Sequence, residues 1–514
     1  MIARLTSQPD PAFAAPAPSF DDFEAGYKQG QPQLVWRKTV SDLETPVSAY
    51  LKLTQAATNS FLLESVEGGE NLGRYSIIGL EPDLIWRANG DKAEINHDPK
   101  KPVYTAQDKP TLESLRDLLA QSRIDLPPEI KHKLPPMAAG VFGYFGYDTV
   151  RLVEHLPNRP KDVLGTDDAI FIRPTVLAVF DNVKQEITFL TPVRPDGTPP
   201  REAYLAANDR LTNIMSRLTK PLPEGHLAPP PGLPDPEFTS NTPPNTFSQM
   251  VNKAKDFIKA GDIFQVVLSQ RYSAEFPAPP FSLYRTLRRL NPSPFMFFLN
   301  FENCTLVGSS PEILVRVRDK QITIRPIAGT RPRGATQAED IALEADLLAD
   351  PKERAEHLML LDLGRNDVGR SAKVGSVRVT EQFTVERYSH VMHIVSNVVG
   401  DLADTSDGVD ALGAGFPAGT VSGAPKIRAM QIIDQLEQEA RGPYGGCIGY
   451  FSADGNIDTC IALRTALIKD GKLHIQAGAG IVADSDAAAE HRECEIKAGA
   501  LVSAAKAAVR LGSQ

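Results

Sequence analysis

A proline-rich segment near the middle of the chain limits the fold more than any other feature of the sequence. Residues 220–245 contain nine prolines, from Pro221 to Pro244. Proline fixes one backbone dihedral angle and lacks an N–H group, so this stretch can form neither a helix nor a central strand. We therefore predict that residues 220–245 connect two folded parts, residues 23–219 and 246–511. Residues 1–22 are expected to form a flexible arm, because prolines interrupt them at four positions.

The net charge and the cysteines exclude several classes of protein. The 55 Lys and Arg residues against 64 Asp and Glu give a net charge of −9, so no global basic field is available to hold nucleic acid or an anionic membrane. No apolar stretch approaches the roughly 20 residues of a membrane span, and the N-terminus has no apolar signal-peptide core. The four cysteines are scattered without a Cys-x-x-Cys pair. We expect a cytoplasmic protein without disulfides, in which any metal is held by oxygen atoms.

Two Asp-Gly dipeptides organise the last hundred residues. Asp454-Gly455 and Asp470-Gly471 are typical hairpin turns and are flanked by apolar runs. Residues 446–452, 459–468 and 472–481 are therefore predicted to be the strands of an antiparallel meander. A long alanine-rich helix should follow, capped by Ser485 or Asp486.

Two pairs of glutamates are candidate metal ligands. In each pair the carboxylates are three residues apart on a predicted helix: Glu353 with Glu356, and Glu490 with Glu493. Asp350 and Pro351 form the start of the first helix. Four carboxylates on two helices could bind one hard cation such as Mg²⁺, which prefers oxygen ligands. The sequence also permits solvent-exposed acidic faces, with Glu493 and Lys497 in an i,i+4 ion pair.

Arg464 is a candidate anion-binding residue. It interrupts the apolar run of the second predicted strand, and strand alternation places it on one face with Ala462 and Ala466, whose small side chains leave room for an anion. An arginine that reaches solvent from an edge strand would give the same pattern. Tyr444 and the glycines within residues 478–480 fall at neighbouring strand ends, where backbone N–H groups can approach a ligand closely.

Glu312 and His393 are candidate acid and base groups. Glu312 begins an apolar run, so partial burial could raise the pKa of its carboxyl and make it a proton donor; an exposed strand end is the alternative. His393, taken alone, is more often a core histidine. Nucleotide-binding motifs do not fit, because residues 478–483 match a dinucleotide fingerprint without the strand that must follow it.

A series of motifs in the second half of the chain carries a resemblance to a known family. The motifs are GDIFQVVLSQR at 261–271, NPSP at 291–294, PIAGTR at 326–331, EHLML at 356–360 and PAGTVSGAPK at 417–426. In this order they resemble the chorismate-utilising enzymes, most closely the large subunit of anthranilate synthase. The resemblance covers residues 246–507 densely and extends thinly to residues 62–65 and 143–148.

The resemblance implies a fold and a division of the chain. The expected architecture is α/β (α+β), with two interleaved halves built on large antiparallel β-sheets, flanking helices and an active-site cleft between the halves. By similarity, residues 23–219 would be an N-terminal regulatory domain and residues 246–511 the chorismate-binding catalytic domain.

The resemblance also implies a role for each candidate residue. Mg²⁺ would bridge the ring carboxylate of chorismate to direct ligands Glu356 and Glu493, with Glu353 and Glu490 acting through water. The implied substrate-binding residues are Arg464 and Tyr444 at the enolpyruvyl carboxylate, with Gly329, Thr330, Gly478, Gly480 and Lys497. The implied catalytic residues are Glu312, the acid for the C4 hydroxyl that departs as ammonia attacks C2, His393, which assists the loss of pyruvate, Thr420 and Gln265.

Two positions distinguish the chain from relatives of different activity. Relatives that add water to chorismate have a lysine base in place of Gln265, and an amide cannot deprotonate water. Relatives that make aminodeoxychorismate commonly have a nucleophilic lysine in place of Ala328. The resemblance therefore implies an anthranilate-forming lyase. The alternatives are a component of aminodeoxychorismate synthase and a catalytically silent subunit that senses chorismate or tryptophan.

The resemblance finally implies partners. The chain has no recognisable glutaminase segment, so ammonia would come from a separate glutamine amidotransferase subunit in a hetero-oligomer. The reaction begins tryptophan biosynthesis, and feedback inhibition by tryptophan is expected. The implied tryptophan site consists of Glu64, Ser65, Pro294, Phe295, Met296 and Cys460.

Overall fold

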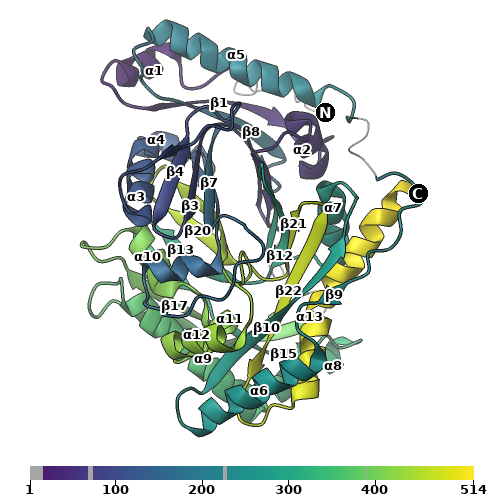
Figure 1. Ribbon diagram of the computed structural model, residues 1–514. Helices are drawn as coiled ribbons and strands as arrows, with labels where there is room; N and C mark the ends of the chain where they lie inside the picture. The colour runs from purple at the N-terminus through teal and green to yellow at the C-terminus, as the bar shows by residue number, and fades with distance from the viewer. Residues whose placement is uncertain (1–14, 67–72, 224–228, 389–390, 514) are drawn as a thin grey trace, which may run out of the picture.

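The computed structural model of the chain describes residues 15–66, 73–223, 229–388 and 391–513 (Figure 1). Within these residues the chain is a mixed α/β structure, and its strands belong to one hydrogen-bonded network of 22 strands. The ladders that connect them are antiparallel. Helices flank this network on its outer sides (Figure 1).

The part of the chain before the proline-rich connection contributes strands with a few covering helices. Its helices are α1 (Phe20–Tyr27), α2 (Pro46–Thr54), α3 (Thr111–Ser122), α4 (Pro128–Lys131), the 3-10 helix η2 (Tyr147–Leu152) and α5 (Pro200–Leu218). Its strands are β1 (Gln33–Val40), β2 (Ser60–Glu64), β3 (Tyr75–Asn89), β4 (Lys92–Asn96), β5 (Thr105–Ala106), β6 (Gly140–Phe145), β7 (Ala169–Asp181) and β8 (Glu186–Val193). Helix α5 lies across β1 and β8 at the top of the molecule and buries Leu211 and Ile214 (Figure 1).

The connection and the part after it contain most of the helices of the described chain. They are α6 (Pro244–Lys259), α7 (Pro280–Leu290), α8 (Gln337–Ala349), α9 (Pro351–Gly369), α10 (Gly408–Gly415), α11 (Gly419–Ser422), α12 (Lys426–Leu436), α13 (Ala487–Arg510) and the 3-10 helix η3 (Leu511–Ser513). The strands are β9 (Thr239–Ser240), β10 (Gln265–Glu275), β11 (Phe295–Asn300), β12 (Thr305–Ser310), β13 (Ile313–Arg318), β14 (Gln321–Ile324), β15 (Ile327–Pro332), β16 (Arg378–Arg387), β17 (Val391–Asp401), β18 (Gly423–Ala424), β19 (Cys447–Ser452), β20 (Ile457–Ile461), β21 (Thr465–Lys469) and β22 (Lys472–Ile481). Helix α13 packs along β22, beside α6 and α7, whereas α9 packs on β15 and β17.

The two parts are interleaved through their strands. Strand β2 pairs with β3 on one side and with β11 on the other, and β6 lies between β7 and β19. The β6 and β19 sequences share the pattern Gly-x-x-Gly-Tyr-Phe, and Gly143 pairs with Gly449. A Cβ atom on Gly143 would lie 1.8 Å from the Ile170 carbonyl oxygen, so the close approach of neighbouring strands requires glycine there. The largest apolar cluster also joins both parts, because it includes Leu211 of α5 and Ala505 of α13.

The local elements that the sequence predicted in the C-terminal region are confirmed. Asp454-Gly455 joins β19 to β20 and Asp470-Gly471 joins β21 to β22, with positive φ angles of 50° and 88° at Asp470 and Gly455. Asp486, not Ser485, caps α13, because its side chain accepts from the Ala489 N–H group.

The prediction of a single strand over residues 459–468 is wrong. The chain is broken into β20 and β21, and Arg464 between them has a left-handed backbone with φ of 46°. The break allows β20 to pair with β13 while β21 pairs with β12. Strand alternation therefore does not set the direction of Arg464, and the argument that it shares a face with Ala462 and Ala466 no longer holds.

The proline-rich connection contains one short edge strand. Ser240 of β9 pairs with Tyr272 of β10, and α6 starts at Pro244. Of the predicted N-terminal arm, residues 1–22, residues 1–14 lie outside the described residues, whereas Ala17 pairs with Trp36 and Ser19 caps α1.

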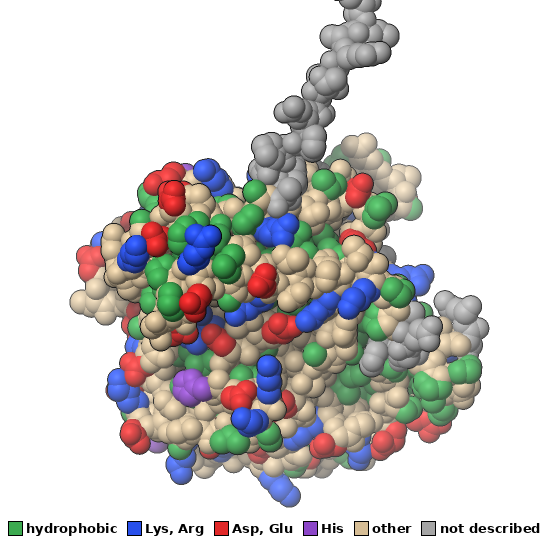
Figure 2. All heavy atoms as spheres, turned by 90° about the horizontal axis from the view of Figure 1, so that it is seen from above, with side chains coloured by type: hydrophobic (Ala, Val, Ile, Leu, Met, Phe, Trp, Pro, Cys, Tyr) green, Lys and Arg blue, Asp and Glu red, His purple; other side chains and the backbone are tan. Residues whose placement is uncertain are grey.

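The surface charge and the helices relate to two classes that the sequence analysis excluded, nucleic-acid-binding proteins and membrane-spanning proteins. On the upper face, basic and acidic side chains alternate without a patch of one sign (Figure 2). No helix in the described part of the chain has the length and apolarity needed to span a membrane.

Candidate active site

Glu312 occupies the short link between β12 and β13 and is buried, with 7% of its surface exposed. Removal from water raises the pKa of its carboxyl to about 8. The Thr420 hydroxyl, which donates to Oε2 at 3.1 Å, and a backbone hydrogen bond from Ile327 oppose this shift without cancelling it. The carboxyl therefore holds a proton at neutral pH and can donate it. The alternative of an exposed strand end is wrong.

His393 lies on β17, where it faces Thr330 of β15. Its Nδ1 lies 2.9 Å from the Gly329 carbonyl oxygen and 3.1 Å from the Thr330 hydroxyl. A carbonyl can only accept, so Nδ1 carries the proton and Nε2 keeps a free lone pair. Burial lowers the pKa of the imidazole. His393 is therefore a neutral side chain that can accept a proton through Nε2.

Arg464 is half-buried, and burial lowers the pKa of its guanidinium. Among the described residues no carboxylate forms an ion pair with it; its electrostatic neighbours are Tyr388 and His393. A partly buried cation without a counter-ion is costly, and an anionic ligand would remove that cost. The left-handed backbone at Arg464, which the strand pattern did not predict, sets the direction of this side chain.

The glutamate pairs lie on α9 and α13 as the sequence predicted. The Asp350 side chain caps α9 by accepting from the N–H groups of Lys352 and Glu353. Burial is the first cause that raises the pKa of Glu353 and of Glu490, and the negative charge of the second glutamate in each pair, Glu356 or Glu493, adds to it. Within each pair the carboxylates therefore repel one another.

The donor chemistry of these pairs fits a hard divalent cation, which would relieve that repulsion. The pairs are not one cluster, because no three metal-ligating side chains gather within the described ranges. A basic side chain lies beside each pair instead. Arg331 is 3.4 Å from Glu353, and Lys497 is 2.7 Å from Glu493, the ion pair that the sequence had left open. Convergence of both pairs on one ion stays a prediction.

Gln265, at the start of β10, connects the first glutamate pair to β22. Its Nε2 donates to Glu356 Oε1 at 3.2 Å. A Cβ atom on Gly480 of β22 would lie 2.6 Å from the same nitrogen, so the glycine leaves room for the amide. Two residues earlier on β22, the Gly478 carbonyl oxygen accepts a hydrogen bond from the Lys497 ammonium group at 3.0 Å. Residues from α9, β10, β22 and α13 thus meet at one edge of the sheet.

Two further glycines bring backbone close to candidate side chains. Gly329 has a φ of 70° at an irregularity in the pairing of β15 with β17, and a Cβ atom there would lie 3.1 Å from Glu353 Oε2. A Cβ atom on Gly478 would lie 2.9 Å from the hydroxyl of the buried Tyr444. Small residues therefore leave space beside both a carboxylate and a phenol.

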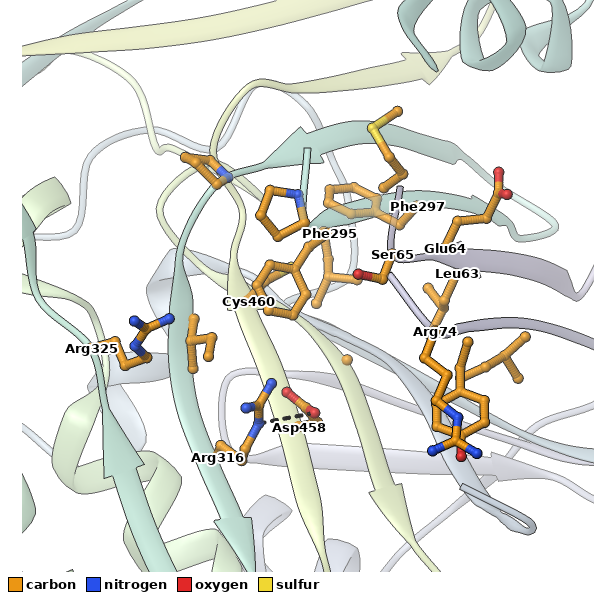
Figure 3. A pocket seen from close by; sticks show the side chains of 18 of the residues that line it. Leu63, Glu64, Ser65, Arg74, Phe295, Phe297, Arg316, Arg325, Asp458 and Cys460 are labelled. Atoms are coloured by element: carbon orange, nitrogen blue, oxygen red, sulfur yellow. Dashed lines mark hydrogen bonds and ion pairs between the residues drawn. The ribbon is translucent and has the colours of Figure 1, made fainter. Parts of the chain in front are cut away.

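The residues implied as a tryptophan site line a separate cavity of about 550 Å³. All of them take part: Glu64, Ser65, Pro294, Phe295, Met296 and Cys460. The cavity lies where β2 of the first part pairs with β11 of the second, and Ser65 points toward Phe295 (Figure 3). The Glu64 carboxylate accepts from Arg288 at 2.9 Å and from Tyr284, so its charge is already neutralised by the protein. None of the implied catalytic or metal-binding residues lines this cavity.

Comparison with known proteins decides the family. The sequence model of the chorismate binding enzymes matches residues 59–503. The chain belongs to this family. Among similar relatives, anthranilate synthase component 1 of Cereibacter sphaeroides is 55% identical over 495 residues, which are 95% of this chain and 97% of that protein. The corresponding protein of Pseudomonas aeruginosa is 48% identical over 465 residues, 89% of this chain and 92% of the relative.

Solved structures with a similar fold support the architecture. Anthranilate synthase component I of Streptococcus pneumoniae has a TM-score of 0.74 and 38% identity, and the match covers 90% of this chain and 99% of that one. The menaquinone-specific isochorismate synthase of Escherichia coli has a TM-score of 0.68 at 20% identity, covering 93% and 95% of the two chains. The expected architecture of interleaved halves on large antiparallel sheets is confirmed.

Sequence reasoning missed a buried ion pair that supports the site of this chorismate-binding fold. Arg441, 2% exposed, forms a bidentate pair with Glu437 at 2.6 and 2.9 Å. Its guanidinium also donates to the Val421 carbonyl at 2.7 Å, next to Thr420, and stacks on Tyr444 with 5.6 Å to the ring centroid. In the sequence, this ion pair could have been suspected from the i,i+4 spacing of Glu437 and Arg441, just before Tyr444.

Proposed function

We propose that this chain is the large subunit of an anthranilate synthase, a lyase that converts chorismate and ammonia to anthranilate and pyruvate at the start of tryptophan biosynthesis. The observation that carries the proposal is the buried Glu312, whose carboxyl has a pKa of about 8, in a chain of the chorismate binding family. A neutral His393 supports it, as does Arg464, which forms no ion pair with a carboxylate among the described residues. The substrate, chorismate, is a small dianion, and the proposed location of the enzyme is the cytoplasm.

Each step of the proposed reaction uses a group with suitable chemistry. Arg464 and Tyr444 hold the enolpyruvyl carboxylate, and Gly329, Thr330, Gly478, Gly480 and Lys497 surround the substrate. As ammonia attacks C2, Glu312 gives its proton to the departing C4 hydroxyl, which leaves as water. Thr420 then stabilises the Glu312 carboxylate through its hydroxyl. In the second step His393 Nε2 accepts the C2 proton as the C3–O bond to the enolpyruvyl group breaks, and the ring becomes aromatic. The released enolpyruvate takes up a proton on its methylene carbon to become pyruvate, and the C2 ammonium group gives up one proton to leave the amine.

The proposed cofactor is Mg²⁺. Glu356 and Glu493 would hold it directly and Glu353 and Glu490 through water. When bound, it would neutralise the ring carboxylate of chorismate and so help to hold the dianion. The repulsion within each glutamate pair supports this assignment, and the ion would take the place of the ion pairs that Arg331 and Lys497 form with Glu353 and Glu493. Gln265 would orient Glu356 through its hydrogen bond of 3.2 Å.

Two side chains favour amination of chorismate followed by elimination of pyruvate over the reactions of related enzymes. Gln265 is not a base for water, and the methyl group of Ala328 cannot form a covalent adduct with the ring. These observations argue against isochorismate and aminodeoxychorismate synthesis. A silent sensing subunit is disfavoured because the full set of candidate acid, base and anion-binding groups is present.

The proposal includes partners and regulation. Ammonia would be supplied by a glutamine amidotransferase subunit in a hetero-oligomer. Tryptophan would bind the 550 Å³ cavity, between an N-terminal regulatory domain, residues 23–219, and a catalytic domain, residues 246–511. An indole ring fits the apolar lining supplied by Pro294, Phe295 and Met296.

One turnover assay tests the function. The purified chain, incubated with chorismate, Mg²⁺ and an ammonium salt, should yield fluorescent ortho-aminobenzoate and an equal amount of pyruvate. A para-aminobenzoate product would identify the sibling activity. Metal-dependent binding of chorismate without any product would identify the silent subunit.

A Ser65→Arg substitution should relieve tryptophan inhibition. The larger cationic side chain would fill the cavity toward Phe295, so tryptophan loses its space, whereas the catalytic groups lie outside the cavity. Turnover without tryptophan should be retained while the concentration for half-inhibition rises more than tenfold. Ser216→Arg, on the exposed side of α5, is the matched control. Unchanged inhibition of the Ser65 variant would remove this cavity from the proposal.

A further inference from the structure

Tyr388 lies between the 550 Å³ cavity and the candidate active site. It lines the cavity together with Arg325 and Glu386. Its ring also meets the ring of His393 edge to face, with 5.6 Å between the centroids. One side chain therefore contacts both the cavity and the histidine to which the proposed reaction assigns a proton transfer.

The hydroxyl of Tyr388 is anchored on the cavity side. It donates to Glu386 Oε2 at 2.9 Å, and Glu386 forms an ion pair with Arg325. Arg325 lies at the edge of the cavity opposite Ser65 and Glu64 (Figure 3). The β16 and β17 ladder sets Glu386 opposite His393. A short chain of packed and hydrogen-bonded residues thus runs from the cavity wall to the histidine.

The phenol group of Tyr388 interacts with two more groups of the proposed reaction. It lies near the Arg464 guanidinium, which has no carboxylate partner among the described residues. The Glu312 carboxyl is also a neighbour of the phenol. Tyr388 therefore contacts His393 and lies close to two further groups of the proposed reaction.

We propose that Tyr388 is a positioning residue that couples occupancy of the cavity to catalysis. Its ring holds His393 in the orientation that the reaction needs while Glu386 holds its hydroxyl at the cavity wall, and a tryptophan in the cavity shifts Tyr388 and disturbs that orientation. Tryptophan contacts the Tyr388 ring from the cavity side, and the close packing of that ring against His393 passes a shift on to the histidine. The inference rests on the proposed function, because it takes tryptophan as the ligand.

A Tyr388→Phe variant tests the coupling separately from binding. The substitution keeps the ring against His393 and removes the bond to Glu386. Tryptophan binding, measured by calorimetry, should stay within about twofold of the wild-type value. The concentration for half-inhibition should rise at least fivefold, since coupling between two sites is commonly worth 5–150-fold. Tyr75→Phe is the matched control, because Tyr75 also lines the cavity whereas, among the described residues, the ring contact of His393 is made by Tyr388, and it should keep the wild-type ratio of inhibition to binding.

Reciprocity provides a readout without turnover. If the two sites are coupled, saturating chorismate weakens tryptophan binding to the wild-type protein by the same factor, and it should not do so in the Tyr388→Phe variant. A variant that is inhibited as tightly as the wild-type protein, or in which chorismate still weakens tryptophan binding, overturns the inference. Failure of the wild-type protein to make anthranilate, or to bind tryptophan, would instead overturn the proposed function or its regulatory site.

Discussion

Replacing Glu312 with Gln should lower kcat by about 100- to 10,000-fold, the range that a positioned proton donor contributes. The amide has almost the same shape as the protonated carboxyl and can still accept from Thr420, but it cannot give a proton to the departing hydroxyl. The measurement is steady-state anthranilate fluorescence, with chorismate binding measured separately. Glu113→Gln, on the exposed side of α3, is the control. A Glu312 variant with more than a tenth of wild-type kcat would show that another group is the acid.

The pH dependence gives a second signature of the same group. Because the pKa of Glu312 is about 8, kcat/KM of the wild-type enzyme should fall as pH rises through about 8, and the Gln variant should lack this limb. Stability should follow the same direction. The folded pKa is raised above the unfolded value of roughly 4.3, so the contribution of this group is complete below that value and is lost as pH rises through about 8. Thermal midpoints at pH 6 and pH 9 should therefore differ less in the variant.

Local elements of the fold could be predicted because short-range rules determine them. Asp350 and Asp486 cap their helices through hydrogen bonds within three residues, and the Asp-Gly turns fix their own hairpins. The pairings of β2 with β11 and of β6 with β19 could not be predicted in the same way, since each joins strands more than 200 residues apart. No local pattern records which distant strand supplies the partner.

Arg464 shows how the same limit affects the site. Its residue type pointed to anion binding, but strand alternation gave the wrong reason, because the chain leaves the strand at this residue to change neighbours. Glu312 was recognisable as a carboxyl before an apolar run, yet only packing reveals that it is buried enough to stay protonated. The sequence did not indicate Arg441 or Tyr388, because their roles depend on side-chain contacts that only the tertiary structure forms.

Substituting Glu356 or Glu493 with Gln should lower turnover at least about 100-fold at fixed Mg²⁺, since a Lewis-acid cation contributes several kcal/mol to such a reaction and each 1.4 kcal/mol is tenfold in rate. Each change removes one charged oxygen ligand from the proposed ion and should also raise the Mg²⁺ concentration for half-maximal activity. Glu495→Gln, an exposed neighbour on α13, is the control and should behave as the wild-type protein.

Stability should respond on a much smaller scale, and this contrast separates a metal ligand from a structural residue. Glu356→Gln keeps the hydrogen bond from Gln265 and relieves repulsion with Glu353, so the free energy of unfolding should rise by a few tenths of a kcal/mol at most. Glu493→Gln gives up a solvent-exposed ion pair with Lys497, which is worth about 0.3–0.5 kcal/mol. Urea unfolding of the metal-free variants measures both values. Variants that keep most of their activity in Mg²⁺, or that lose activity only in proportion to lost stability, would contradict a catalytic ion at these carboxylates.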